Sequence, residues 1–374
     1  MAVIIAARRT AVVPRGGAFS TLHPHELAAP VIAAMLRDTG LNPGDIGQLF
    51  LSNALGGGGN PARMAALFSG LGPVSGLSID AQCAGGLDAI AMAAAWVDAG
   101  FARAVIAGGS ESFSQRPLRA TQPGPDGAPS FYTRPPFSPF PEQDPDLTSA
   151  ADDLARGLGL SRQEQDGFAV ESHRKALAAR DVLSCEIVPI QGVDHDAFTR
   201  RLTVNTARRS KTLAGSVSAA ATAVEADGAA FCLVVADDMG ALVDHAVSIR
   251  AHACVGADPA LPGIAPVAAI TRVLAACGLT PNDLSTIEVM EAYAAQAIAC
   301  IRLGHLPDDR TNVSGGALSR GHPIGASGAI LVCRAFHELK RRPGPALCTI
   351  AAAGGIGSAM VLETSVDRAP RSRR

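Results

Sequence analysis

The spacing of hydrophobic positions along the first 110 residues predicts strands and helices in alternation. Short apolar runs that stop at glycine or polar residues are typical of buried strands, whereas apolar residues three or four positions apart are typical of helices. On this basis we expect strands at residues 3–7, 46–51 and 104–107, and helices at residues 25–36, 62–69 and 83–97. This order indicates a layered α/β unit.

A proline-rich stretch then interrupts the alternation. Residues 115–146 contain nine prolines, so this stretch cannot form regular helix or central strand. Two helical segments follow at residues 149–158 and 162–180, and Ser161 with Glu164 has the spacing of a capping box for the second. Because a small-residue and strand pattern resumes at Gly215, we interpret the middle of the chain as an insertion in the first unit.

The rest of the chain repeats the pattern of its first part. Residues 29–31, Ala-Pro-Val, lead to Gly-Leu-Asn-Pro at 40–43, and 236 to 238 positions later residues 265–267 lead to Gly-Leu-Thr-Pro at 278–281. Such self-similarity predicts two related α/β units. Their central helices would correspond to each other and could lie side by side.

Each of these central helices opens with a reactive side chain. Cys83 precedes Ala-Gly-Gly and a run that is apolar on nearly every face, which predicts a helix buried on all sides with Cys83 in its first turn. Free N–H groups and the dipole at a helix start favour the thiolate. His322 opens the matching helix of the second unit, so a thiol and an imidazole suited to thioester chemistry would meet.

Simpler interpretations exist for both residues. A single cysteine is commonly a buried thiol that packs as a small hydrophobe, and a single histidine is commonly a core residue that bonds a carbonyl. The matching, glycine-flanked positions of Cys83 and His322 in the two units favour the functional interpretation.

Composition narrows the class of protein. The chain has 374 residues, of which 48% are hydrophobic and 18% charged, with a net charge of −2. It can therefore bury a large core, and it offers no basic surface for nucleic acid or an anionic membrane, apart from a basic tail at residues 368–374 that we expect to be solvated. Eight cysteines without a C-x-x-C pair indicate reduced thiols and no metal site. The start of the chain has no signal-peptide layout, so we expect a cytoplasmic protein that does not enter membranes.

A series of motifs resembles the thiolase family, the acetyl-CoA C-acyltransferases. The motifs follow family order over almost the whole chain: Arg9-Thr10 with Gly16-Gly17-Ala18, Asn60-Pro61-Ala62-Arg63, the Cys83 segment, Gly108-Gly109-Ser110-Glu111-Ser112, Glu186-Ile187-Val188-Pro189, Asp227-Gly228-Ala229-Ala230, Asn312-Val313-Ser314-Gly315-Gly316-Ala317 and Gly321-His322-Pro323. The resemblance implies an α/β thiolase fold with two duplicated βαβαβαββ halves in an α-β-α-β-α layering. The implied domains are residues 1–117 with 212–241, an inserted loop domain at 118–211, and 242–374.

The resemblance also implies roles for single residues. Cys83 matches the nucleophile that carries the acyl group, and His322 matches the histidine that activates it. The backbone N–H groups of Cys83 and Ala353 match an oxyanion hole. Coenzyme A or acyl-CoA would be a substrate, not a bound cofactor. It would be held by the loop domain, with Arg200 close to the nucleotide, and would pass Ala219 and Ala223 along its pantetheine. Homodimers or homotetramers are expected.

Two departures from the family pattern affect the expected chemistry. Met290 stands where the family has the asparagine of Asn-Glu-Ala-Phe, which becomes Met290-Glu291-Ala292-Tyr293 here. Ala351 stands where the second catalytic cysteine is expected, and Cys348 could replace it only with an insertion in the glycine loop. We therefore expect a thiolase-like acyltransferase that forms or cleaves a C–C bond through acyl-Cys83. The alternatives are acyl transfer or condensation with a different acceptor, or a catalytically reduced subunit that binds CoA esters.

Overall fold

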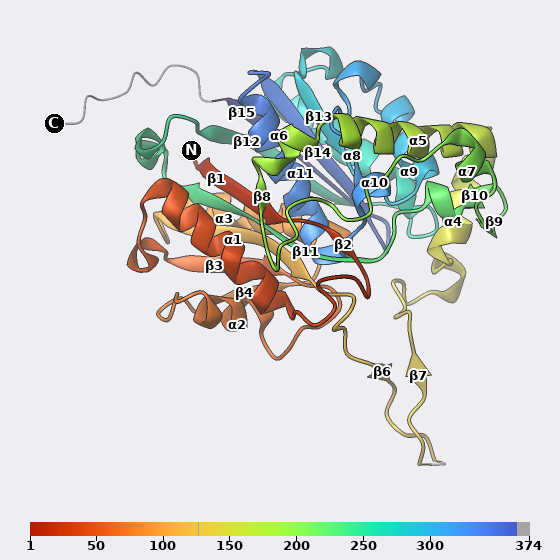
Figure 1. The fold of residues 1–374 in the computed structure, drawn as a ribbon, viewed down its shortest axis with the longest axis horizontal. Coiled ribbons are helices and arrows are strands. Elements are labelled where there is room, and N and C mark those ends of the chain that lie inside the picture. Colours follow the sequence, from red (N-terminus) through yellow and green to blue (C-terminus); the bar gives the residue numbers. More distant parts are fainter. Residues whose placement is uncertain (126, 365–374) are drawn as a thin grey trace.

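The protein is described by a computed structural model over residues 1–125 and 127–364 (Figure 1). Its main sheet has the strand order β13-β14-β15-β12-β1-β11-β5-β3-β4, and outside this order β2 pairs with β11 and β8 pairs with β1. The strands of this sheet are β1 (Val3–Thr10), β2 (Val13–Pro14), β3 (Gln48–Ser52), β4 (Leu77–Ile79), β5 (Ala104–Glu111), β8 (Ile187–Val188), β11 (Ala226–Val235), β12 (Val247–Gly256), β13 (Thr286–Val289), β14 (Pro345–Ala352) and β15 (Ile356–Thr364). The basic tail at residues 368–374 lies outside the described residues.

The helices divide between the two halves and the insertion. They are α1 (Pro24–Thr39), α2 (Pro61–Phe68), α3 (Gly85–Asp98), α4 (Leu147–Gly157), α5 (Arg162–Ala178), α6 (Arg180–Ser184), α7 (Val204–Arg208), α8 (Ala265–Cys277), α9 (Ala294–Leu303), α10 (Ala317–Arg320) and α11 (Ile324–Leu339). Within the described part of the chain, none of them has the length and apolarity that crossing a membrane requires.

The sheet confirms the predicted duplication. The order β3-β5-β11-β1 in the first half corresponds to β13-β14-β15-β12 in the second. In each half the first pair of strands is parallel and the next two pairs are antiparallel. The two halves join where β1 pairs with β12.

A central layer of helices packs between the two halves of the sheet, and further helices cover the outer face of each half. The α3 and α11 helices share one apolar cluster with the inner faces of both halves. The α1 and α2 helices cover the outer face of the first half, and α8 and α9 cover that of the second. The central helices are nearly in backbone contact, since a Cβ atom on Gly86 would lie 2.7 Å from the carbonyl oxygen of Gly325. This layering is the α-β-α-β-α order expected for the fold.

The insertion is a separate layer at one end of the molecule. Its helices α4, α5 and α7 gather beside α9 and α10 (Figure 1) and share a small apolar cluster with them. Two short hairpins belong to this region, β6 (Arg119–Ala120) with β7 (Phe131–Tyr132) and β9 (Thr212–Ala214) with β10 (Val217–Ser218). The first projects from the molecule as an arm. The limits of the loop domain, residues 118 and 211, stay a prediction.

The prediction that the Cys83 helix is buried on all sides is wrong. Met92 of α3 is 39% exposed and Ala95 is also exposed, whereas α11 is buried from Gly325 to Leu339. The difference arises because α11 lies between the two halves, and one face of α3 is left uncovered in this chain. Cys83 also lies before α3, in a 3₁₀ turn formed by Gln82–Ala84.

Candidate active site

Cys83 and His322 meet where the two central helices begin. The 3₁₀ turn that contains Cys83 leads directly into α3, and His322 lies two residues before α11. The Sγ atom of Cys83 is 3.2 Å from Nε2 of His322. Both side chains are half-buried and line one pocket. The structure thus brings together the two side chains that open the matching helices.

The hydrogen bonds of Ser327 favour one tautomer of His322. Ser327, in the first turn of α11, donates its hydroxyl hydrogen to the carbonyl oxygen of Pro323 at 3.0 Å. The Ser327 Oγ atom is 2.7 Å from Nδ1 of His322 and can then only accept from it. In the neutral ring the proton is therefore on Nδ1, which leaves Nε2 free to accept a proton from Cys83.

Burial keeps both groups uncharged at neutral pH. It raises the pKa of the Cys83 thiol to about 12, although two backbone N–H groups oppose the shift. Burial, together with the nearby Arg320, lowers the pKa of His322 to about 4. Backbone N–H groups near the helix start do favour the thiolate, as expected, but burial outweighs them and the thiol stays protonated. The proton would leave sulfur only as the thiolate is used, which is general-base catalysis.

Two backbone N–H groups point toward the sulfur atom. They belong to Cys83 itself and to Ala353, which follows strand β14. An oxygen that gains charge beside Sγ would lie between them, as in an oxyanion hole. This arrangement does not depend on any side chain, so alanine at position 353 does not impair it.

The pocket around Cys83 has mainly apolar walls. It spans about 890 Å³ including its open mouth. Helix α4 of the insertion contributes Leu147, Ala150, Ala151 and Leu154, and Pro262 and Ala292 of the second half also line the pocket. Such a pocket suits an acyl chain or another flexible apolar group next to the thiol.

The structure separates the two candidates for a second cysteine position. Ala351 lines the pocket together with Cys83, whereas Cys348 is fully buried in the core, where its thiol donates to the carbonyl oxygen of Leu331 at 3.4 Å. The two residues are three positions apart on β14, so their side chains point to opposite faces. Met290 is also buried in the central core and presents no polar atom to the pocket.

The three predicted CoA contacts lie in different surroundings. Ala223 lines the pocket, and its N–H donates to the carbonyl oxygen of Ala292 at 2.9 Å. Ala219 is exposed outside it. Arg200 is exposed as well, and its guanidinium lies 4.0 Å from the centroid of the Phe198 ring. The structure therefore places only Ala223 beside Cys83.

Sequence reasoning missed two residues that organise this site. One is Ser327. The sequence signal that could have identified it is its position five residues after His322, in the first turn of the helix. The other is Glu111, which accepts hydrogen bonds from the N–H groups of Ala54 and Gly325 at 2.9 Å each and so fixes the start of α11 to the first half. A charged residue at the end of a strand that is otherwise small and apolar was the available signal for Glu111.

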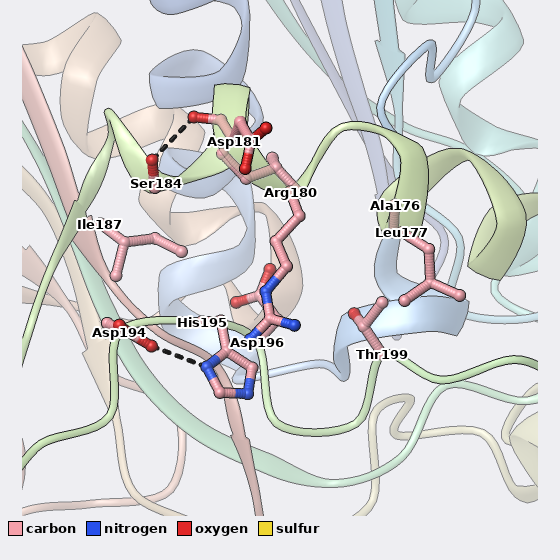
Figure 2. A pocket seen from close by; sticks show the side chains of 11 residues that line it. Ala176, Leu177, Arg180, Asp181, Ser184, Ile187, Asp194, His195, Asp196 and Thr199 are labelled. Atoms are coloured by element: carbon pink, nitrogen blue, oxygen red, sulfur yellow. Dashed lines mark hydrogen bonds and ion pairs between the residues drawn. The ribbon is translucent and has the colours of Figure 1, made fainter.

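A second pocket, of about 720 Å³, lies within the insertion and is lined by residues between Ala176 and Thr199 (Figure 2). It contains a serine, a histidine and aspartates, but they do not form a catalytic set. The hydroxyl of Ser184 donates to the carbonyl oxygen of Asp181, while His195 Nδ1 pairs with the neighbouring Asp194 at 2.7 Å. Figure 2 shows Ser184 and His195 on different sides of the pocket. The Cys83 pocket therefore remains the candidate active site.

Comparison with known proteins agrees with this geometry. Sequence models described as "Thiolase, N-terminal domain" and "Thiolase, C-terminal domain" match residues 2–246 and 243–364. The chain is 38% identical to "Putative acetyl-CoA C-acetyltransferase YhfS" of Bacillus subtilis, over 97% of this chain and 99% of that protein. It is 35% identical to "Putative acetyl-CoA C-acetyltransferase VraB" of Staphylococcus aureus strain MRSA252, over 96% and 98%.

A solved structure shares the fold as well. The crystal structure of the Bacillus anthracis acetyl-CoA acetyltransferase superposes with a TM-score of 0.89 at 28% identity, covering 97% of this chain and 98% of that one. The matches extend over nearly all of the described residues, in both halves and in the insertion. The chain belongs to the thiolase family.

Proposed function

We propose that the protein is a thiolase-type acyltransferase that acts on acyl-CoA or 3-oxoacyl-CoA thioesters through an acyl-Cys83 intermediate. The observation that carries the proposal is the 3.2 Å contact between Cys83 Sγ and His322 Nε2 in an apolar pocket. The names of the relatives, acetyl-CoA C-acetyltransferases, support a CoA thioester as the substrate.

The proposed first step uses only groups in this pocket. Nε2 of His322 takes the proton from Cys83, and the thiolate attacks the thioester carbonyl carbon of an acyl-CoA, or the 3-oxo carbonyl carbon of a 3-oxoacyl-CoA. The carbonyl oxygen becomes an oxyanion that the N–H groups of Cys83 and Ala353 stabilise. The carbon–sulfur bond to CoA, or the carbon–carbon bond of a 3-oxoacyl group, then breaks. The leaving group recovers the proton from His322, and the acyl group stays on Cys83.

Mass spectrometry tests this step directly. The purified chain is incubated with acetyl-CoA and with a panel of acyl-CoA and 3-oxoacyl-CoA esters, and the peptide that contains Cys83 is examined for added acyl mass. We expect acylation of Cys83 that Cys83→Ala abolishes and that Cys185→Ala, which removes an exposed thiol elsewhere, does not affect. No acylation across the panel would overturn the proposal. Co-purification with a second enzyme, with full activity retained after Cys83→Ala, would indicate a subunit that only binds CoA esters.

The nature of the second step depends on Ala351. A methyl group cannot move a proton, and the structure places this methyl group in the pocket beside Cys83. This observation favours a second candidate function, in which acyl-Cys83 reacts with an acceptor that needs no deprotonation by a cysteine, such as one activated by decarboxylation. Product analysis with simple and with carboxylated acceptors distinguishes this reaction from thiolysis.

We also propose that the protein forms a homodimer or homotetramer. Three exposed apolar features support an assembly: Met92 on the uncovered face of α3, Leu77 on the edge strand β4, and Phe131 on the projecting arm, which is 67% exposed. Light scattering of the purified chain measures the number of subunits.

Arg200 and Ala219 are proposed as contacts to CoA on their family positions alone. A cytoplasmic location stays a prediction from sequence.

A further inference from the structure

A tyrosine hydroxyl lies in the wall of the Cys83 pocket. Tyr293 stands at the start of α9 and lines the pocket together with Cys83, His322 and Ala351. Its backbone pairs with Thr222, and its hydroxyl oxygen lies 3.1 Å from Oγ1 of Thr148 on α4. The ring therefore reaches from the second half of the fold toward the insertion.

Tyr293 differs from the other uncharged polar side chains of this pocket in its freedom to change partners. The amide of Gln82 donates to the carboxylate of Asp80, and the hydroxyl of Thr222 donates to the carbonyl oxygen of Ser218. Gln296 accepts from the N–H of Ala292 and donates to the sulfur of Cys300. The Tyr293 hydroxyl is paired with the hydroxyl of Thr148, and both O–H bonds can rotate. The Tyr293 hydroxyl can therefore exchange this partner for a bound molecule at a small cost in free energy.

Acyl transfer to carbon involves two thioester carbonyl groups, and each develops negative charge on its oxygen. The first is attacked by Cys83 and lies beside the N–H groups of Cys83 and Ala353. The second belongs to the CoA thioester whose α-carbon becomes, or leaves as, an enolate. This second oxygen also requires a hydrogen-bond donor. Met290 is buried in the core and has no donor to provide.

We propose that the hydroxyl of Tyr293 donates a hydrogen bond to the carbonyl oxygen of this second thioester, turning away from Thr148 when the substrate binds. The inference rests on the proposed function. The O–H bond of Tyr293 stays intact throughout, and its only contribution is to stabilise charge on the substrate oxygen. In agreement with this role, burial raises the pKa of Tyr293, so the group stays protonated and is a donor at neutral pH.

Two variants of the full-length chain test the proposal. Tyr293→Phe removes only the hydroxyl, whereas Thr148→Val removes its resting partner and leaves the tyrosine in place. For each, the rate of Cys83 acylation is measured by quenched mass spectrometry, and kcat and KM are measured for the complete reaction. We expect Tyr293→Phe to lower kcat of the complete reaction roughly 10-fold to 100-fold, through the second step. This fold-change should be at least ten times larger than the fold-change in the rate of Cys83 acylation. We expect Thr148→Val to change kcat less than about 3-fold, because the hydroxyl then has no competing partner.

The possible results separate this inference from the proposed function. If the hydroxyl only joins α9 to α4, both variants will lose the same activity and the same thermal stability, and the inference is overturned. The inference is also overturned if the second step is as fast in Tyr293→Phe as in the wild type. If the wild type turns over too slowly to measure, the comparison is made in an Ala351→Cys background. Absence of turnover in both backgrounds also counts against the inference about Tyr293. Absence of Cys83 acylation in wild type is a different result, which refutes the proposed function itself.

Discussion

The hydroxyl of Ser327 connects the helix geometry of α11 to the reactivity of Cys83. Ser327 is only 3% exposed, and its hydroxyl donates to the carbonyl oxygen of Pro323 and accepts from Nδ1 of His322, which leaves Nε2 as the base. The imidazole can hold its proton on Nε2 only if the Ser327 hydroxyl gives up its bond to Pro323 and donates to Nδ1 instead. One hydroxyl thus selects both the tautomer and the orientation of the ring.

Removal of this hydroxyl should slow acyl capture. We expect Ser327→Ala to lower the rate of Cys83 acylation roughly 10-fold to 100-fold, because His322 would then sample the wrong tautomer and orientation. The rate is measured by quenched mass spectrometry with acetyl-CoA. Ser314→Ala, which removes a buried hydroxyl bonded to Glu338, is the matched control. Equal acylation rates in the two variants would contradict the role given to Ser327.

Position 351 gives a second prediction at the scale of one residue. Ala351→Cys places a thiol in the pocket beside Cys83, where the wild type has a methyl group. If proton transfer at this position limits the second step, the variant should gain acetoacetyl-CoA thiolysis by roughly 10²-fold to 10⁴-fold. The measurement is loss of acetoacetyl-CoA in the presence of CoA. Because Cys348 is buried in the core, Cys348→Ala should leave thiolysis unchanged, and no gain in Ala351→Cys would mean that another feature limits the second step.

Single residues were predictable from sequence where the chain repeats a motif. Cys83 and His322 stand out because each opens a glycine-flanked helix at a matching position. The choice between Ala351 and Cys348 stayed open in the sequence, since it depends on which face of β14 looks into the pocket. The pKa values of Cys83 and His322 could not be predicted either, because a sequence motif does not give the depth of burial that decides them.

At the scale of elements, the close packing of α11 against α3 and β5 depends on glycines at three positions. A Cβ atom at Gly86 would lie 2.8 Å from the backbone nitrogen of Ala329, one at Gly328 would lie 2.4 Å from that of Leu87, and one at Gly109 would lie 1.9 Å from the carbonyl oxygen of Gly325. These contacts involve backbone atoms, which cannot move aside as a side chain can. The distance between the helix starts, and with it the contact between Cys83 and His322, is therefore set by the missing side chains.

A methyl group added between the two helices should separate them. We expect Gly86→Ala to lower the free energy of unfolding by about 1–3 kcal/mol and to slow Cys83 acylation, because overpacking displaces α3 from α11. Urea unfolding and the acylation assay measure the two effects. Gly167→Ala is the control: it adds the same methyl group in α5, where nothing lies within 4 Å, and should stabilise the protein by up to about 1 kcal/mol. Equal stability of the two variants would contradict the packing argument.

The same glycines explain which elements sequence reasoning described incompletely. The strand predicted at residues 104–107 continues to Glu111, because Gly108 and Gly109 are needed for close contact and do not end the strand. The capping box at Ser161 and Glu164 formed as predicted, since it depends only on neighbouring residues. By contrast, Gln82 has a φ of 51° just before Cys83, a conformation that surrounding contacts impose and that no local pattern indicates.

At the scale of the whole molecule, a buried ionic network joins the insertion to both halves. Glu186, near the end of the insertion, accepts from Arg9 of β1 at 2.6 Å and from Arg334 of α11 at 2.5 Å. Arg9 also pairs with Asp196, and Arg334 with Glu338. Burial alone would raise the pKa of Glu186, but Arg334 and Arg9 outweigh it and lower this pKa to about 2. Buried ion pairs around Glu186 therefore fix the insertion and the two halves relative to each other.

Neutralising the centre of this network should destabilise the entire fold. We expect Glu186→Gln to lower the free energy of unfolding at pH 7 by roughly 3–5 kcal/mol, because it leaves Arg9 and Arg334 buried with less compensation. The Glu186 pKa is lower in the folded chain than in the unfolded one. Its contribution is therefore fully present above pH 4.5, the ordinary value, and is lost as the pH falls toward 2.

Denaturant unfolding of both proteins at several pH values measures this contribution. The difference between wild type and Glu186→Gln should be constant above pH 4.5 and should shrink below it, wherever both proteins still fold. Glu171→Gln breaks an exposed pair with Arg174 on α5 and should cost less than about 1 kcal/mol at any pH. A Glu186→Gln effect as small as this control would show that the insertion is held by its apolar contacts with α9 and α10, and that the buried charges do not determine its position beside the Cys83 pocket.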